Sequence, residues 1–92
     1  DLPAKLIIKN LDFAVTAKEL HEFFSDHPND HRQKIRLIRV KIHTDKSGRS
    51  LGSAEIVFAL KSDAMKAMQE YNGVTLDGRP MHIYLDESPK IG

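Results

Sequence analysis

Residues 34 to 58 read KIRLIRVKIHTDKSGRSLGSAEIVF and contain two alternating stretches around one turn. From about Lys34, apolar residues alternate with mainly basic ones, and a period of two is typical of a half-buried β-strand. A second alternating stretch ends at Phe58, and Asp45-Lys46-Ser47-Gly48 supplies the turn between them. We therefore expect a β-hairpin. Its buried face should carry Ile38, Val40, Ile42, Ala54, Ile56 and Phe58.

The segment before the hairpin predicts one strand and one helix. Residues 5–9 form a short, β-branched apolar run typical of a strand. Residues 16–19 have the spacing of a capping box, with Val15 and Leu20 placed as a hydrophobic staple across the first turn. A helix should begin there and end before Pro28, because proline interrupts helical hydrogen bonding. Its buried stripe should be Leu20, Phe23 and Phe24.

The remaining residues predict a connector, a second helix and a last strand. Residues 28–31 have the composition of a connector. Ser62 is placed to cap a second helix, which Asn72-Gly73 should close with a left-handed residue. Asp77-Gly78 is typical of a turn. The last strand alternates over residues 81–85, and its outward side chains should be His82 and Tyr84.

The predicted order is β-α-β-β-α-β, which indicates an α+β domain. This order favours a ferredoxin-like sandwich, in which two helices pack on one face of a four-stranded antiparallel sheet. The other face of the sheet is then left open to solvent. We expect this open face to carry Ile7, Lys9, Arg39, Lys41, His43, Ser53, Glu55, Val57, His82 and Tyr84.

Composition limits the class of protein. The 92 residues, 40% hydrophobic and 29% charged, predict one globular domain, with a core at about residues 4–86 and a frayed tail at residues 87–92. No apolar run approaches the roughly 18 residues that cross a bilayer, so no membrane association is expected. The absence of cysteine excludes disulfides and fits a reducing, intracellular compartment. We expect a monomer that holds no cofactor.

Charge is distributed unevenly along the chain. Residues 31–50 contain seven basic residues and one acidic residue, a net charge of +6. The rest of the chain contains seven basic and twelve acidic residues, a net charge of −5. A clustered basic segment is the usual electrostatic footprint of a protein that binds a polyanion. The alternative is a solvated strand and loop with no ligand.

Three catalytic or metal-binding interpretations are weak. Gly48-Arg49-Ser50-Leu51-Gly52 matches a nucleophile elbow, but that motif needs a strand before it and a helix after it. His27 and His31 have neighbouring aspartates, but Pro28 interrupts any helix that would align them as metal ligands. A phosphate-cleaving enzyme of the same fold would need an anion-binding loop after the first strand, and none is present. We expect no enzyme activity and no metal.

Two motifs resemble those of the RNA recognition motif family. Residues 6–11, LIIKNL, are similar to the family's hexapeptide motif, and residues 51–58, LGSAEIVF, are similar to its octapeptide motif. Within the family the chain most resembles the Aly/REF messenger-RNA export adaptors, on residues 10–13, 47–52 and 71–81. The resemblance implies a nuclear protein that shuttles to the cytoplasm, with an mRNA export receptor and a DEAD-box helicase as partners.

The resemblance also implies weak RNA binding. Family members that read sequence stack bases on aromatic residues, and the matching positions here are Ile7, Ser53 and Glu55. Each missing stack should cost roughly 1 to 3 kcal/mol of affinity for single strands. Cations would then carry the binding, without much sequence preference and with strong salt dependence. The candidate RNA-binding residues are Ile7, Lys9, Arg39, Lys41, His43, Lys46, Arg49 and Tyr84.

A protein-docking role is the second functional hypothesis. Glu19 and Glu22 lie on the outer side of the first helix, and resemblance to the export adaptors implies that this surface receives partners. The alternative to an RNA-binding adaptor is therefore a protein-interaction module of the same fold, whose sheet binds little or no RNA. The missing aromatic residues favour this alternative, whereas the +6 segment opposes it.

Overall fold

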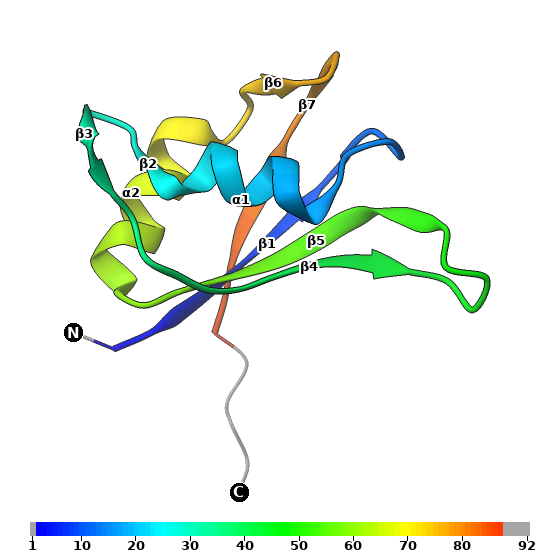
Figure 1. Cartoon of the computed structure of the whole chain (residues 1–92), viewed down its shortest axis with the longest axis horizontal. Helices are drawn as coiled ribbons and strands as arrows, with labels where there is room; N and C mark the ends of the chain where they lie inside the picture. The colour runs from blue at the N-terminus through cyan, green and yellow to red at the C-terminus, as the bar shows by residue number, and fades with distance from the viewer. Residues whose placement is uncertain (1, 88–92) are drawn as a thin grey trace, which may run out of the picture.

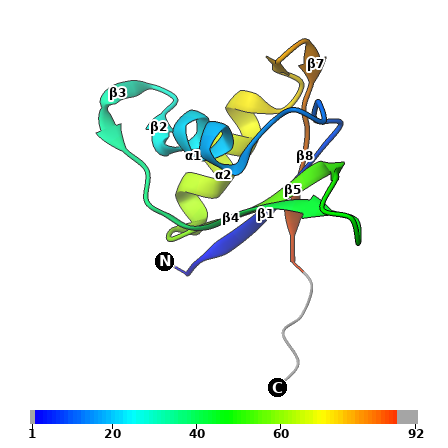
Figure 2. The same ribbon diagram turned by 45° about the vertical axis from the view of Figure 1, so that its right-hand side comes forward.

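A computed structural model describes residues 2–87 and shows two helices on one face of a four-stranded antiparallel sheet (Figure 1). The expected ferredoxin-like β-α-β-β-α-β sandwich is confirmed. In spatial order the strands are β4 (Leu37–Thr44), β5 (Ser50–Phe58), β1 (Ala4–Lys9) and β8 (His82–Asp86). The helices are α1 (Ala17–Ser25) and α2 (Lys61–Tyr71). Figure 2 shows both helices on the same side of the sheet, so no element among residues 2–87 covers its second face.

The buried core lies between the sheet and the helices. Phe24 and Phe58 are the largest of its fully buried side chains. Their rings are 6.4 Å apart in an edge-to-face arrangement, and Phe24 meets Phe23 and Tyr71 in the same way. Such ring pairs add stabilisation beyond the area that they bury. The predicted stripe of the first helix is thereby confirmed, with Phe23 at its half-buried edge.

The start of α1 is capped as predicted, whereas the start of α2 is not. The Glu19 amide donates to Thr16 Oγ1 at 3.1 Å, as a capping box requires. The prediction that Ser62 caps the second helix is wrong, because the helix begins at Lys61. The Lys61 amide donates to the Leu2 carbonyl at 2.7 Å, so a segment distant in sequence satisfies that amide. At the other end Gly73 is left-handed, as expected.

Two short ribbons were not predicted. Residues 28–31 were expected to be a connector, but they lie in a ribbon of β2 (Asp26–His27) and β3 (Asp30–Lys34). Lys34 consequently ends this ribbon rather than starting the long basic strand. Asp77-Gly78 is a turn, as predicted, and it joins a second ribbon. The strands of that ribbon are β6 (Thr75–Leu76) and β7 (Arg79–Pro80).

Ile38 does not lie on the buried face of the sheet, so this prediction is also wrong. Leu37 pairs with Phe58 and Arg39 pairs with Val57, which makes Ile38 an extra residue in β4. A bulge of this kind shifts the alternation by one residue. Leu37 packs on the core in place of Ile38, whose exposed fraction is 57%. Val40 and Ile42 keep their predicted places beside the core.

Two further predictions concern the C-terminal tail and membrane-spanning segments. The expected frayed tail, residues 87–92, lies outside the described residues except for Glu87. Lys61 Nζ is 3.5 Å from Glu87 Oε2. Among residues 2–87, neither helix has both the length and the apolar character needed to cross a membrane.

Candidate nucleic-acid interface

The middle of the open sheet face brings together three of the predicted residues. Ile7 on β1 pairs with Tyr84 on β8, so their side chains are neighbours on one face. Lys9 Nζ lies 6.0 Å from the centre of the Tyr84 ring, within reach of a cation–π interaction. Half of Tyr84 (51%) is exposed. This group offers an aromatic surface and a positive charge side by side.

A carboxylate occupies the neighbouring part of the face. Glu55 Oε2 lies 3.5 Å from Arg39 Nε, and Glu55 Oε1 lies 3.3 Å from His43 Nε2. The other ring nitrogen of His43 is 2.8 Å from Ser53 Oγ. Only 17% of the Glu55 side chain is exposed, so its ion pairs are shielded from water more than ordinary surface pairs. Arg39 and His43, both predicted to bind RNA, are therefore held by an internal acid.

The electrostatic surroundings keep Glu55 ionised. Burial alone would raise the pKa of this carboxyl group, because it disfavours the charged form. The hydrogen bond with His43 and the charges of Lys5 and Arg39 outweigh burial and hold the pKa of Glu55 below its usual value. At neutral pH a negative charge is thus fixed at the centre of the open face.

The other predicted cations are spread over the hairpin. Lys41 is exposed on β4, in register with Glu55. Lys46 and Arg49 lie in the exposed β4–β5 turn, which projects beyond the sheet (Figure 1). Asp45 shapes this turn, because its side chain accepts from the amide of Arg49 at 3.0 Å. The eight predicted residues therefore form a central group, a pair bound to Glu55, the single exposed Lys41 on β4 and a separate loop.

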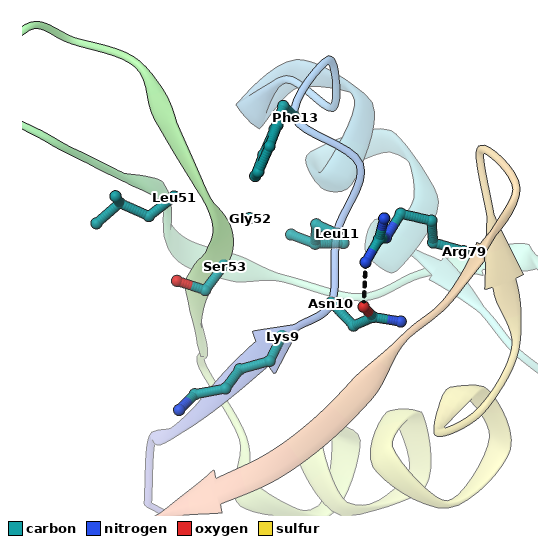
Figure 3. A pocket seen from close by; sticks show the side chains of 8 residues that line it. All are labelled: Lys9, Asn10, Leu11, Phe13, Leu51, Gly52, Ser53 and Arg79. Carbon is teal, nitrogen blue, oxygen red and sulfur yellow. Dashed lines mark hydrogen bonds between the residues drawn. The ribbon is translucent and has the colours of Figure 1, made fainter.

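A pocket at one end of the sheet was missed by sequence reasoning. It has a volume of about 370 Å³ and lies where the loops after β1 and before β8 meet the start of β5 (Figure 3). Seven of its eight lining residues, all except Lys9, were not predicted as site residues, although all seven stand in the motifs that carried the family resemblance. The pocket is lined by Lys9, Asn10, Leu11, Phe13, Leu51, Gly52, Ser53 and Arg79.

Hydrogen bonds between distant segments build this pocket. Arg79 Nη2 donates to Asn10 Oδ1 at 2.6 Å (Figure 3). Asn10 Nδ2 donates in turn to the Pro80 carbonyl at 2.8 Å. The Leu11 amide donates to the Gly52 carbonyl at 2.9 Å. Asn10 takes a positive φ of 65°, a conformation that asparagine tolerates better than most residues. The pocket is thus fixed by the fold rather than by one loop.

Gly52 allows the two sides of the pocket to meet, so Gly52→Ala is expected to be destabilising. Its φ is +78°, and an added Cβ would lie 3.1 Å from Phe13 Cε1 and 3.2 Å from the Leu11 carbonyl oxygen. We expect a loss of about 2 to 3 kcal/mol in the free energy of unfolding, measured by urea denaturation. Gly48→Ala is the matched control, because Gly48 also has a positive φ but no atom within 4 Å of the added Cβ. It should lose about 1 kcal/mol, and equal losses would contradict this account.

The two acidic residues of α1 differ in their surroundings. The hydrogen bond between Glu19 and Asp77, with partial burial and the charge of Asp77, raises the pKa of Glu19. Glu22 is exposed. Glu19 is therefore engaged with the β6–β7 turn, and of the predicted docking pair only Glu22 is a simple solvated acid.

The residues weighed for catalysis and metal binding take structural roles. Ser50 begins β5, and its hydroxyl accepts from the Gly52 amide at 3.1 Å. His27 Nδ1 accepts from the Asn29 amide at 3.1 Å within the β2–β3 turn. In the part of the chain that the structure describes, no group of three or more His, Asp or Glu residues is placed to hold a metal ion.

The fold and the open face define a ferredoxin-like domain with one uncovered sheet surface. The RNA recognition motif family model matches residues 6–82, and the chain belongs to this family. The expected resemblance to the Aly/REF group is confirmed by similarity to THO complex subunit 4 proteins of Arabidopsis thaliana. Subunit 4A is 42% identical over 79 residues, and subunit 4C is 45% identical over 76 residues.

These matches cover most of this chain but a small part of the relatives. They span 86% and 83% of the chain, and 30% and 23% of subunits 4A and 4C. The chain therefore spans less than a third of the length of these relatives. Human heterogeneous nuclear ribonucleoprotein M is 34% identical over 86 residues, which are 94% of this chain and 11% of that protein.

Solved structures share the architecture. The second RNA recognition motif domain of yeast poly(U)-binding protein superposes with a TM-score of 0.77 at 25% identity, over 96% of this chain and 99% of that one. The RNA-binding protein PG1 superposes with a TM-score of 0.81 at 18% identity, over 96% and 99% of the two chains, and supports the fold alone.

Proposed function

We propose that this chain is a weak, low-specificity RNA-binding adaptor domain that acts in nuclear mRNA processing and export. The observation that carries the proposal is the group on the middle of the open face, where Lys9 lies over Tyr84 beside Ile7. An exposed ring offers one stack to an unpaired base, and a cation beside it attracts the adjoining phosphate. Membership of the family and similarity to THO complex subunits support the same role.

Weak binding follows from what occupies the other positions of the face. Ile7, Ser53 and Glu55 stand where sequence-reading relatives carry aromatic side chains, so at most one stack, on Tyr84, remains on the sheet. Glu55 also neutralises Arg39 and repels phosphate. We expect micromolar or weaker affinity, with most of the binding energy from Lys9, Lys41 and the hairpin loop.

The adaptor role concerns partners other than RNA. We propose that the domain is monomeric and nuclear, with shuttling to the cytoplasm, and that the protein containing it couples mRNA to an export receptor and a DEAD-box helicase. The helices lie on the side of the sheet opposite the face that we propose binds RNA, so the helical side is the surface available to such proteins (Figure 2). Glu22 lies on that helical side, with Glu19 beside it.

A protein-interaction module that binds no RNA is the second candidate. The specific observation that favours it is the Glu55 cluster, which holds two of the candidate RNA-binding side chains in internal contacts. The exposed Lys9 and Lys41 favour the RNA-binding function instead, because neither cation lies within 4 Å of a carboxylate among the described residues.

An NMR titration with a short single-stranded RNA at two salt concentrations tests the proposal. Amide shifts are expected at Lys9, Lys41, Arg49 and Tyr84, and they should collapse at the higher salt concentration. Lys41→Ala is expected to weaken binding severalfold and to lower the slope of log affinity against log salt by about 0.7.

The matched control is Lys66→Ala, which removes the same charge from an exposed position on α2. It should leave both the affinity and the salt slope unchanged. If no shifts occur at low salt, or if they are confined to the helices, the domain does not bind RNA through its sheet and the protein-interaction module is the better account.

A further inference from the structure

We infer that the pocket between Phe13 and Leu51 is a second nucleotide subsite, which takes the base of one unpaired RNA nucleotide with Lys9 and Arg79 at its phosphate. This inference rests on the proposed function, because it assumes that the domain binds single-stranded RNA. The base would then be bound beside the sheet face, and not at the positions on that face where relatives carry aromatic residues.

Two large apolar side chains that line the pocket, Phe13 and Leu51, are exposed to solvent. The exposed fractions are 74% for Phe13 and 58% for Leu51, and both line one hollow together with Leu11 (Figure 3). The Phe13 loop is fixed, because the Asp12 side chain accepts from the Ala14 amide at 2.8 Å and the Asp12 carbonyl accepts from the Val15 amide at 3.0 Å. A loop whose backbone is held in place gives up little backbone freedom when a base stacks on its aromatic side chain.

The charges around the pocket favour an anionic occupant. Its lining contains two cations, Lys9 and Arg79, and no carboxylate. Arg79 donates to the neutral amide of Asn10, so its positive charge is oriented but not neutralised. Among the residues that the structure describes, no carboxylate lies within ion-pair distance of either cation. An apolar protein segment would cover these charges without pairing them, which is costly.

The pocket is continuous with the central group of the open face. Lys9 lines the pocket and also lies over the ring of Tyr84. A strand that stacks one base on Tyr84 can therefore place a neighbouring base against Phe13, with Lys9 between them. The volume of about 370 Å³ falls within the range of small-ligand sites, roughly 300 to 1,000 Å³, and is sufficient for one base.

Two substitutions of Phe13 separate base stacking from simple apolar packing. Phe13→Leu keeps an apolar side chain but removes the aromatic face, whereas Phe13→Trp keeps an aromatic face. With five-residue oligouridylate and oligoadenylate as probes at low salt, Phe13→Leu should bind about tenfold more weakly than the unsubstituted chain. Phe13→Trp should bind at least as tightly, and Met65→Ala, which alters an exposed apolar residue on α2, should bind normally.

Changes in amide chemical shift show where the substitution acts. They also distinguish a failure of this inference from a failure of the proposed function. In Phe13→Leu the shifts at Leu11 and Gly52 should disappear while the shift at Tyr84 remains. If Phe13→Leu binds normally and Leu11 and Gly52 never shift, the pocket takes no nucleotide and is better suited to a protein segment, while the proposed function stands. If the unsubstituted chain shows no shifts with either probe, the proposed function and this inference both fail.

Discussion

Glu55→Gln is expected to strengthen binding of single-stranded RNA by about threefold to tenfold at low salt. The substitution keeps the shape of the side chain and removes the negative charge at the centre of the open face. Arg39 and His43, which now lie 3.5 Å and 3.3 Å from the carboxylate oxygens, would then be available to phosphate. The affinity is measured by fluorescence anisotropy with a labelled oligouridylate at several salt concentrations.

Glu70→Gln provides the control, because Glu70 is an exposed acid on α2 and its replacement changes the net charge equally. A general effect of net charge would raise the affinity of both variants. We expect less than a twofold change for Glu70→Gln and a steeper salt dependence only for Glu55→Gln. Unchanged affinity in Glu55→Gln would show that RNA does not pass over this part of the sheet.

Phe24→Ala is expected to remove about 3 to 5 kcal/mol from the free energy of unfolding. Phe24 is fully buried on α1 and contacts the rings of Phe23, Phe58 and Tyr71. Truncation leaves a cavity between the helix and the sheet that the surrounding rings cannot fill. Because domains of this kind are stable by about 5 to 15 kcal/mol, the variant should be largely unfolded in modest urea.

Phe13→Ala is the matched control, since it makes the same truncation at an exposed position. It should change stability by about 0.5 kcal/mol or less. Both values come from urea denaturation followed by far-UV circular dichroism. Similar losses in the two variants would mean that the aromatic cluster under α1 does not determine the stability of the core.

Local patterns in the sequence were sufficient for the main elements of the fold. The capping box at Thr16 and the alternation after Met81 each depend on neighbours a few residues apart, and both are confirmed. The prediction for Ile38 was wrong because the bulge is decided by pairing with Val57 and Phe58, which lie about twenty residues further along the chain. The cap at Ser62 failed because the helix already begins at Lys61, whose amide donates to the Leu2 carbonyl from the other end of the chain.

The candidate site was predictable in its residue types but not in its pairings. Sequence reasoning placed Arg39 and Glu55 on one face, yet it could not show that they form an ion pair. The strand register places Glu55 opposite Lys41, and the Arg39 side chain reaches Glu55 diagonally. The pocket was invisible because it joins segments far apart in sequence, such as Asn10 and Arg79. The one available signal was the pair of large apolar residues, Phe13 and Leu51, that no strand or helix pattern buries.

The bulge at Ile38 affects how copies of this protein meet one another in concentrated solution. β4 is an outer strand of the sheet, and outer strands have free backbone groups that can pair with another molecule. An extra residue twists such an edge and interrupts its hydrogen-bonding ladder, while the cations on the strand repel a second copy. The irregularity that turns Ile38 away from the core therefore also disfavours edge-to-edge pairing at β4.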